Sequence, residues 1–394
     1  MVRRAELIGR RFTSRLHDER VSSWLGIWLG VSFAAAFVTG LISHFMQHPP
    51  DWLVWPARPV NLYRVTQGVH VISGLATVPL LLAKLWTAYP KLWQWPPIRS
   101  LAHAVKRGFI FLLVAGSLFE LGTGILNIDY WYPFPFNFPA AHYWTSYILI
   151  GALIVHIVNE WDAIRRSVGR PADRSAGDTD GTGGAGGDDT TPVASGLTRR
   201  GMFGLVAGAS GLVAAVTVGE ALSPLARFAV LAPRRPGVGP QRLPVNKTAA
   251  DARVRSAALD PNWRLVVAGG AARALSLSLG ELRGLPMRTL RLPISCVEGW
   301  SAEAAWTGVR VRDVIALAGG ADPHARIMVE SLEPSGRYRT SELDWPHWRD
   351  PGTLLAVELN GEPLALDHGY PCRLIAPNRP GVLQTKWLAR LVIT

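Results

Sequence analysis

The feature that most constrains the fold of this chain is a series of apolar stretches in its first half. They lie at residues 24–46, 66–88, 108–128, 142–161 and 202–222. About 20 residues of helix are needed to cross the apolar core of a bilayer. Inside lipid every backbone N–H and C=O must be paired within the segment, so each stretch is predicted to be helical. We therefore expect a multi-pass membrane protein, with a four-helix transmembrane bundle followed by a fifth helix.

Basic residues gather in alternate loops and predict the orientation of these spans. Between the first two spans there are only Arg58 and Arg64, and the loop between the third and fourth has no basic residue. The basic segments carry Arg3, Arg4, Arg10, Arg11, Arg15 and Arg20, then Lys91, Arg99, Lys106 and Arg107, then Arg165, Arg166, Arg170, Arg174, Arg199 and Arg200. Such segments stay in the cytoplasm. We expect a cell-membrane protein with a cytoplasmic N-terminus and everything after the fifth span outside.

The net charge of +12 follows largely from this topology, so a nucleic-acid partner is not expected. Residues 171–195, "PADRSAGDTDGTGGAGGDDTTPVAS", are too polar and too rich in glycine to form a core, which predicts a flexible linker. From residue 246, short β-type runs alternate with turns and short helical patches, typical of one α+β domain. The predicted organisation is a tail (1–20), the four-span domain (21–163), the cytoplasmic linker (164–200), a signal-anchor helix (201–224), a second linker (225–245) and the α+β domain (246–394).

Four histidines fall inside or at the edge of the predicted spans: His44, His70, His142 and His156. Ionisable residues inside a bilayer are costly and often functional, and imidazole is a usual axial ligand of haem iron. His70 and His142 have comparable depths near the outer ends of their spans, so they are the first candidates for binding a haem b. His44 competes for either role, and all four could instead be interfacial or helix-bridging.

A second, inner haem is also conceivable. His156 lies fourteen residues after His142 on the same helix face, about 21 Å away, too far for one haem. Its partner would be Lys84, at the matching position of the second span, or His103. The four-span unit resembles bacterial cytochrome-b-type membrane anchors, which implies electron exchange with the quinone pool.

Only two cysteines occur, Cys296 and Cys372. Cys296 ends an apolar strand and begins a turn in "RLPISCVEGWS"; a lone cysteine is most often a small buried hydrophobe. However, "CVEGWS", "AWTGVRVRDVIALAG" and "LLAVELNGEPLALDHGYPCRL" follow one another in an order and spacing that resemble the molybdopterin-dependent sulfite oxidase family. Within it, residues 245–394 are most similar to the methionine-sulfoxide reductase branch called YedY or MsrP.

This resemblance implies that Cys296 is the thiolate ligand of molybdenum, a role that suits a soft anionic donor. It further implies that His368, Arg373 and Lys386 hold the anionic molybdopterin, and that Asn246 lies near the cofactor. Arg and Lys are natural partners of its phosphate. Trp300 is expected to line the mouth of the site or to belong to the core, and Cys372 is expected to be structural.

These residues together predict a membrane-bound molybdenum oxidoreductase. We expect it to reduce a small-molecule or protein-bound S-oxide or N-oxide with electrons from quinol through haem b. Alternatives are a dehydrogenase that passes electrons from sulfite or an organic substrate to quinone, and a haem-only electron-transfer or scaffold protein with a metal-free domain. The arginines that surround sulfite in sulfite oxidases are not identifiable, because "LPVNKT" and "EGWS" stand in their place.

The start of the fifth span, "LTRRGMF", resembles a twin-arginine export signal, with Thr198, Arg199, Arg200 and Phe203 at the expected places. Two arginines before a span are also expected from the positive-inside rule. A molybdopterin domain has to fold around its cofactor in the cytoplasm, however, and only a route for folded cargo could then export it. The twin-arginine translocase is therefore the predicted partner.

Overall fold

The computed structural model describes residues 15–92, 96, 98–169, 197–221, 223–230 and 234–394. The predicted linker at 171–195 and the arginines at 3, 4, 10, 11, 170 and 174 lie outside these residues. The chain divides into two compact units, each described by itself. The first contains residues up to Ala34, Gly74–Ile125 and Phe134–Val213; the second contains Ala35–Ser73, Leu126–Pro133 and Ala214–Thr394.

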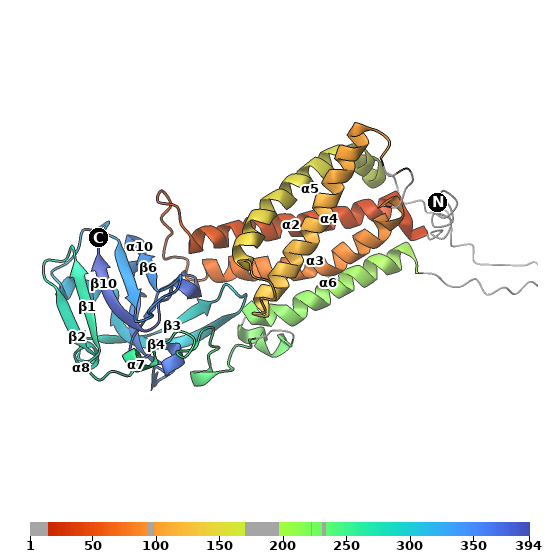
Figure 1. Cartoon of the computed structure of the whole chain (residues 1–394). Helices are drawn as coiled ribbons and strands as arrows, with labels where there is room; N and C mark the ends of the chain where they lie inside the picture. The colour runs from red at the N-terminus through yellow and green to blue at the C-terminus, as the bar shows by residue number, and fades with distance from the viewer. Residues whose placement is uncertain (1–14, 93–95, 97, 170–196, 222, 231–233) are drawn as a thin grey trace, which may run out of the picture. The chain divides into compact units, whose positions relative to one another are not determined.

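Five long helices correspond to the five apolar stretches (Figure 1). They are α2 (Glu19–Gln47), α3 (Leu62–Leu92), α4 (Leu101–Ile128), α5 (Phe138–Gly169) and α6 (Arg199–Ala221). Each is long and apolar enough to cross a membrane, which confirms the predicted all-α membrane part. The helices extend several residues beyond the apolar stretches, because a helix can continue through polar residues outside the apolar layer.

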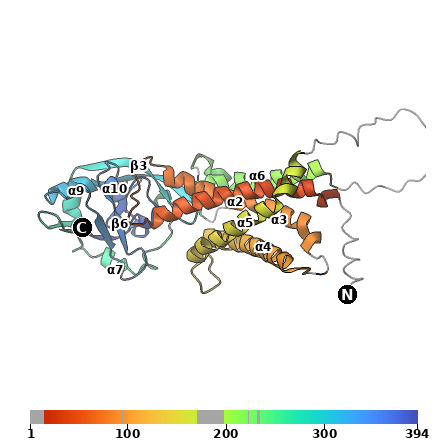
Figure 2. The ribbon, with the colours of Figure 1, turned by 90° about the horizontal axis from the view of Figure 1, so that it is seen from above.

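Figure 2 shows the ribbon of the helices from above. Within the first unit, apolar side chains pack the helices together. Leu25 of α2 packs with Met202 and Val206 of α6. A second cluster combines Leu29 and Phe33 of α2 with other helices. Polar contacts also cross between helices, since Ser32 Oγ lies 2.8 Å from Thr77 Oγ1. The helices are thus held by close packing and by a few hydrogen bonds, as expected for segments in lipid.

The second unit carries two five-stranded sheets. The first has the order β2-β1-β10-β5-β6, in which only β1 and β10 run parallel; the second has the order β3-β4-β7-β8, with β9 also paired to β7. The strands are β1 (Arg264–Gly269), β2 (Leu275–Ser278), β3 (Met287–Ser295), β4 (Ser301–Arg310), β5 (Ile327–Ser331), β6 (Thr340–Leu343), β7 (Leu354–Leu359), β8 (Glu362–Pro363), β9 (Arg373–Ile375) and β10 (Leu388–Ile393). The predicted α+β class is confirmed.

Short helices complete the secondary structure. They are η1 (Arg15–His17) in the first unit and, in the second, η2 (Ser223–Phe228), η3 (Pro240–Arg242), α7 (Arg255–Ala258), α8 (Leu279–Arg283), α9 (Val311–Leu317), α10 (Trp345–Trp348), η4 (Leu366–His368) and η5 (Gly381–Leu383). Helix α8 begins with a capping box, in which the Ser278 side chain accepts from the Glu281 N–H and Glu281 bonds back to Ser278. The main core lies between these elements and includes Leu265, Val329 and Leu355, all fully buried.

The β-type runs of the sequence, "WRLVVAGG", "TLRLPISC", "ARIMVES", "TLLAVELNG" and "CRLIAP", coincide with β1, β3, β5, β7 and β9, and the helical patch "VRVRDVIALAGG" coincides with α9. Strand β4 has the sequence "SAEAAWTGVR", which contains alanine, glycine and glutamate, residues of low strand propensity. It is central all the same, paired with β3 on one side and β7 on the other. Small side chains there allow close packing: Ala304 is 1% exposed and Trp306 is fully buried.

Candidate functional site

A β-hairpin presents Cys296. Strands β3 and β4 pair as far as Ser295 and Ser301, and the five residues between them form the turn. The Cys296 N–H donates to Trp300 O at 2.8 Å, and the Gly299 N–H donates to Cys296 O at 3.1 Å. Gly299 has a φ of +101°, a conformation that favours glycine. As expected from the sequence, Cys296 follows directly on the end of a strand.

The predicted molybdopterin residues converge on one cavity. Cys296, Asn246, His368, Arg373 and Lys386 all line it, and Trp300 does so as well. Its volume is only about 10 Å³, so these side chains lie close together. Trp300 is also buried in the adjoining core and donates from its indole N–H to Glu298 at 3.2 Å. Trp300 therefore belongs both to the lining of the cavity and to the core.

His368 and Arg373 form the floor of this cavity. The His368 ring lies with Nε2 2.8 Å from Pro240 O, which accepts its proton. Burial and the charge of Arg373 lower the pKa of His368 to about 4, so the ring is neutral at pH 7. Arg373 donates to His368 O at 3.0 Å and to Gln384 O at 3.2 Å. Burial lowers the pKa of Arg373 to about 9, so it keeps its charge, stacked 5.0 Å from the Trp306 ring.

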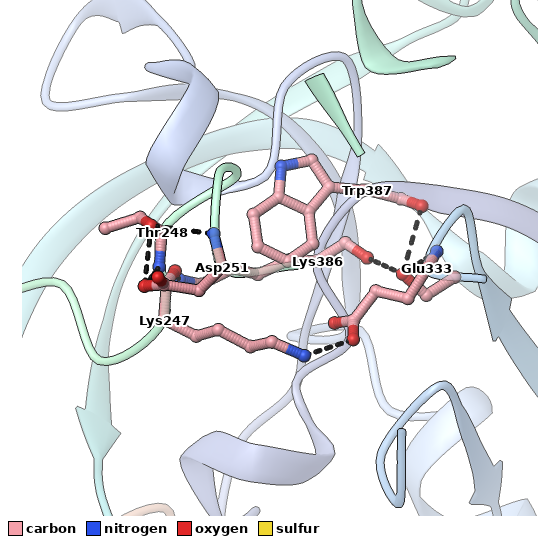
Figure 3. Close-up of polar contacts among 7 residues, drawn as sticks. Lys247, Thr248, Asp251, Glu333, Lys386 and Trp387 are labelled. Carbon is pink, nitrogen blue, oxygen red and sulfur yellow. Dashed lines mark hydrogen bonds and ion pairs between the residues drawn. The ribbon is translucent and has the colours of Figure 1, made fainter. Parts of the chain in front are cut away.

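Lys386 links three chain segments around the cavity. Its Nζ donates to Lys247 O at 2.9 Å and to Asp367 O at 2.8 Å, while the Ala249 N–H donates to Asp367 Oδ1 at 2.8 Å. Figure 3 shows the neighbouring Lys247 side chain extended toward Glu333, with which it forms an ion pair. Burial lowers the pKa of Lys386 well below its usual range. An ammonium group can donate three hydrogen bonds, and these two carbonyls accept two of them.

The donor set suits an anionic pterin with a thiolate-bound metal. Arg373 Nε is buried without a hydrogen-bond partner, and the third N–H of Lys386 remains for a further acceptor. Two cations beside a soft sulfur ligand match a phosphate-bearing metal cofactor. Within the described part of the chain, no three His, Cys, Asp or Glu residues gather as a metal site. The remaining ligands of a metal at Cys296 would then come from the cofactor. Cys372 is fully buried in the core, and burial raises the pKa of its thiol.

Residues outside the α+β domain also contact the Cys296 turn, which the sequence did not suggest. Within the second unit, Gln67 Nε2 on α3 donates to Val297 O at 3.3 Å. A Cβ at Gly299 would lie 3.0 Å from Val71 Cγ2. Arg64 forms an ion pair with Glu303 of β4 at 2.8 Å. The first turns of α3 therefore form one wall of this region.

A larger cavity of about 230 Å³ lies on the other side of η5. The Pro380 and Leu383 side chains line this cavity, while Gly381 lines the cofactor cavity. Its polar lining includes Arg337, Arg379, Tyr338, His48 and His347. Arg337 Nη2 lies 3.0 Å from His48 Nε2, and burial together with Arg337 lowers the pKa of His48 to about 4. None of these residues was singled out from the sequence, because they come from separate segments.

The structure places the candidate haem ligands in both units. In the second unit, His70 Nδ1 lies 2.8 Å from Ala36 O, and the lack of a side chain at Gly40 makes room for the ring. His44 is stacked edge-on against His48 with ring centroids 5.2 Å apart. In the first unit, His142 Nδ1 lies 3.0 Å from Glu120 Oε2. Since His70 and His142 belong to different units, their pairing stays a prediction.

The inner candidates lie in the first unit. His156 interacts electrostatically with Lys84, whose Nζ donates to Ser22 O and Oγ, each at 2.7 Å. His103 is half-buried at the start of α4, where its Nδ1 accepts from the Arg99 N–H at 3.2 Å. The second haem likewise stays a prediction.

Comparison with known proteins defines the class of the C-terminal part. Residues 252–394 match the family described as oxidoreductase molybdopterin binding domain. This α+β part of the chain is thus a molybdopterin-dependent oxidoreductase domain.

Several individual proteins are similar to this domain. The chain is similar to mitochondrial sulfite oxidase of Macaca fascicularis, 32% identical over 162 residues, covering 34% of this chain and 30% of the relative. It is also similar to nitrate reductase (NADPH) of Mycosarcoma maydis, 30% identical over 171 residues, covering 34% and 17%. The sulfane dehydrogenase SoxCD structure from Paracoccus pantotrophus has 24% identity, a TM-score of 0.32, and coverage of 34% and 38%. The chain spans about a third or less of these sequence relatives. Its C-terminal residues thus match a molybdopterin-binding oxidoreductase domain and are similar to sulfite oxidases, and five long apolar helices precede them.

Proposed function

We propose that the protein is a membrane-bound molybdenum reductase that acts on an S-oxide or N-oxide outside the membrane. The observation that carries this proposal is the convergence of Cys296, Arg373 and Lys386 on one buried cavity within a molybdopterin-binding domain. We infer the substrate class from the resemblance of "CVEGWS" to the YedY or MsrP branch. Quinol is the proposed source of electrons.

Each residue of the cavity has a distinct part in this proposal. Cys296 ligates the metal, and Arg373 and Lys386 bind the anionic end of the pterin through charge-assisted hydrogen bonds. Neutral His368 holds the Pro240 carbonyl and so fixes the loop that closes the cavity. Asn246 offers an amide at the opposite wall. The bound molybdopterin supplies the two-electron redox chemistry.

Helix α3 supports an electron supply from the membrane part. It carries His70 and also contacts the Cys296 turn through Gln67 and Val71. A haem b bound by His70, with His142 as the proposed second ligand, would sit on the helix that reaches the metal ligand. His44 is the alternative outer ligand, and an inner haem with His156 is a further possibility. Reduced-minus-oxidised absorption spectra of the purified protein test this haem.

Orientation and export belong to the same proposal. The basic residues of the loops favour a cytoplasmic N-terminus and an extracytoplasmic C-terminal domain. The twin-arginine sequence at Arg199 and Arg200 is proposed to direct the folded domain to the twin-arginine translocase.

A dehydrogenase that oxidises sulfite or an organic substrate and passes electrons to quinone is the second candidate. The similarity to sulfite oxidases favours it, as do Arg337 and Arg379 in the larger cavity, because guanidinium groups suit an oxyanion.

The deciding experiment uses the purified full-length chain. Molybdenum and pterin contents are measured first, in the wild type and in Cys296→Ser. Dimethyl sulfoxide and trimethylamine N-oxide are then supplied with reduced viologen, and sulfite with ferricyanide. We expect about one molybdenum per chain, reduction of the oxides, and loss of activity in Cys296→Ser. Wild-type protein without molybdenum would exclude this function, and turnover of sulfite alone would favour the dehydrogenase.

A further inference from the structure

Tyr63, in the first turn of α3, is buried with a hydroxyl group that lacks a partner. Its side chain is 1% exposed, and it is among the largest fully buried side chains of the described residues. Among the described residues, the hydroxyl has no hydrogen-bond partner. Leaving a buried hydroxyl unpaired is unfavourable, because its hydrogen bonds to water are lost. Such groups are few in native proteins, and each one calls for a physical reason.

The position of Tyr63 points to that reason. It interacts electrostatically with Cys296 and with Tyr338. Residues four apart lie on the same face of a helix, so Tyr63 shares a face with Gln67 and Val71. These two residues contact Val297 and Gly299 of the Cys296 turn. Tyr63 thus lies on the helix face that meets the turn of the metal-ligand cysteine.

The backbone around Tyr63 is held firmly. Asn378 Oδ1 accepts from the Tyr63 N–H at 2.9 Å, and the Asn378 N–H donates to Val60 O at 3.1 Å. Asn378 Nδ2 also donates to Pro56 O at 2.7 Å. On the next residue, the Arg64 guanidinium is fixed by its ion pair with Glu303. Tyr63 is therefore placed rigidly, as a binding residue has to be.

Two other tyrosines interact with Cys296, and they differ from Tyr63. Tyr132 donates its hydroxyl proton to Asn127 Oδ1 at 3.1 Å and is exposed. Tyr338 is only half-buried and lines the larger cavity. Of these three, Tyr63 combines complete burial with an unpaired hydroxyl.

We propose that Tyr63 completes the molybdenum site as a hydrogen-bond donor to the oxygen atom of a ligand bound beside Cys296. The ligand class is a molecule with an accessible oxide oxygen, such as an S-oxide, an N-oxide or an oxyanion. A neutral phenol serves this class because it donates one hydrogen bond without adding charge. The inference rests on the proposed function, and it assigns a residue of the site to a helix of the membrane part.

The test compares Tyr63→Phe with the wild type in the full-length, cofactor-loaded protein. Tyr143→Phe is the matched control, because the Tyr143 hydroxyl bonds to Tyr147 at 3.0 Å on an exposed surface of α5. Molybdenum content and the thermal unfolding midpoint are measured first. We expect Tyr63→Phe to keep both, since it removes a hydroxyl that has no partner in the protein.

The informative readouts are spectroscopic and kinetic. Addition of dimethyl sulfoxide or of sulfite is expected to change the Mo(V) EPR spectrum of the wild type and of Tyr143→Phe, and to leave that of Tyr63→Phe unchanged. The KM for the oxide is expected to rise about tenfold or more in Tyr63→Phe, the effect of losing one hydrogen bond to a ligand.

Two results would overturn the assignment. One is an EPR response of Tyr63→Phe identical to that of the wild type; the other is loss of molybdenum or of thermal stability in this variant, which would make Tyr63 a packing residue. A wild-type protein that holds molybdenum but reduces neither S-oxides nor N-oxides refutes the proposed function instead. The sulfite arm of the EPR comparison still decides the role of Tyr63 in that case.

Discussion

At the scale of single residues, the cofactor cavity combines a lasting positive charge on Arg373 with a neutral ring on His368. Arg373 keeps its charge although burial lowers its pKa to about 9. His368 is neutral because burial and Arg373 lower its pKa to about 4. This arrangement offers charge to a single anionic group and avoids adding the charge of the imidazole in a small buried space. It agrees with a cofactor bound by one phosphate-bearing end.

A second buried histidine predicts how stability depends on pH. His347 is 4% exposed, and neither ring nitrogen has a hydrogen-bond partner in the structure. Burial and Arg379 lower its pKa to about 3. A histidine with a lowered pKa is protonated more easily in the unfolded chain, so its contribution is complete above pH 6.5 and is lost as the pH falls toward 3. We expect the second unit to lose about 1 kcal/mol per pH unit within this window.

Hydrogen exchange of the β7 amides at several pH values measures this loss. His347→Leu should reduce the pH dependence without abolishing it, because His368 and His48, whose pKa values are also lowered to about 4, remain. His324→Leu, at an exposed position, is the control and should keep the wild-type dependence. An equally steep dependence in His347→Leu would show that other groups cause it.

Residues of the cavity were predictable to different degrees. Cys296, His368, Arg373 and Lys386 stand in short contiguous blocks, and the structure brings them to one cavity. Tyr63 was not predictable, because a tyrosine at the end of an apolar helix is ordinarily an interfacial anchor. Its place near the Cys296 turn depends on contacts of α3 with residues more than 200 positions away in the sequence.

At the scale of elements, the loop before α3 is bound to the α+β domain through the ion pair of Arg58 with Asp350 and through Asn378. This residue has a φ of +49° and is 3% exposed. Its two side-chain bonds, to Pro56 O and from the Tyr63 N–H, hold both ends of one loop. Alternating patterns predicted β1 and β5, but nothing local in "APNRPG" predicted this contact. Side-chain bonds between distant loops leave no periodic pattern in a sequence.

Asn378→Ala is expected to release this loop. It removes two hydrogen bonds, each worth about 1 kcal/mol, and places alanine in a left-handed conformation at about 1 kcal/mol more. Amide exchange at residues 60–66 should then accelerate about 100-fold. Asn378→Gly separates the causes, because it loses the same bonds and keeps the backbone conformation without strain. Unchanged exchange in both variants would mean that other contacts hold the loop.

At the scale of the whole molecule, strand order bears on when the C-terminal domain can fold. Strand β10 comes last in the strand sequence and yet lies at the centre of its sheet, between β1 and β5. The sheet can therefore close only after β10 has been synthesised. A domain that closes its sheet with its last strand, and that needs a cofactor, is suited to a route that exports folded proteins.

The internal twin arginine can be tested by replacing Arg199 and Arg200 with lysine. The structure gives Arg199 another role, since its Nη2 lies 2.8 Å from Asp18 Oδ2. Lysine keeps both the charge that orients the span and the ability to pair with Asp18, so it removes only the guanidinium groups. We expect the wild-type C-terminal domain to be digested by protease added to spheroplasts, and the double variant to be protected.

The matched control replaces Arg165 and Arg166 with lysine at the end of α5, where the same charges lie outside the export sequence. This variant should be digested like the wild type. Digestion of the Arg199 and Arg200 variant at the wild-type rate would mean that α6 is an ordinary anchor, and protection of the wild-type domain would contradict the proposed orientation. These outcomes distinguish two roles of the paired arginines before α6. Either their charge alone orients the span, or the twin-arginine translocase recognises the pair.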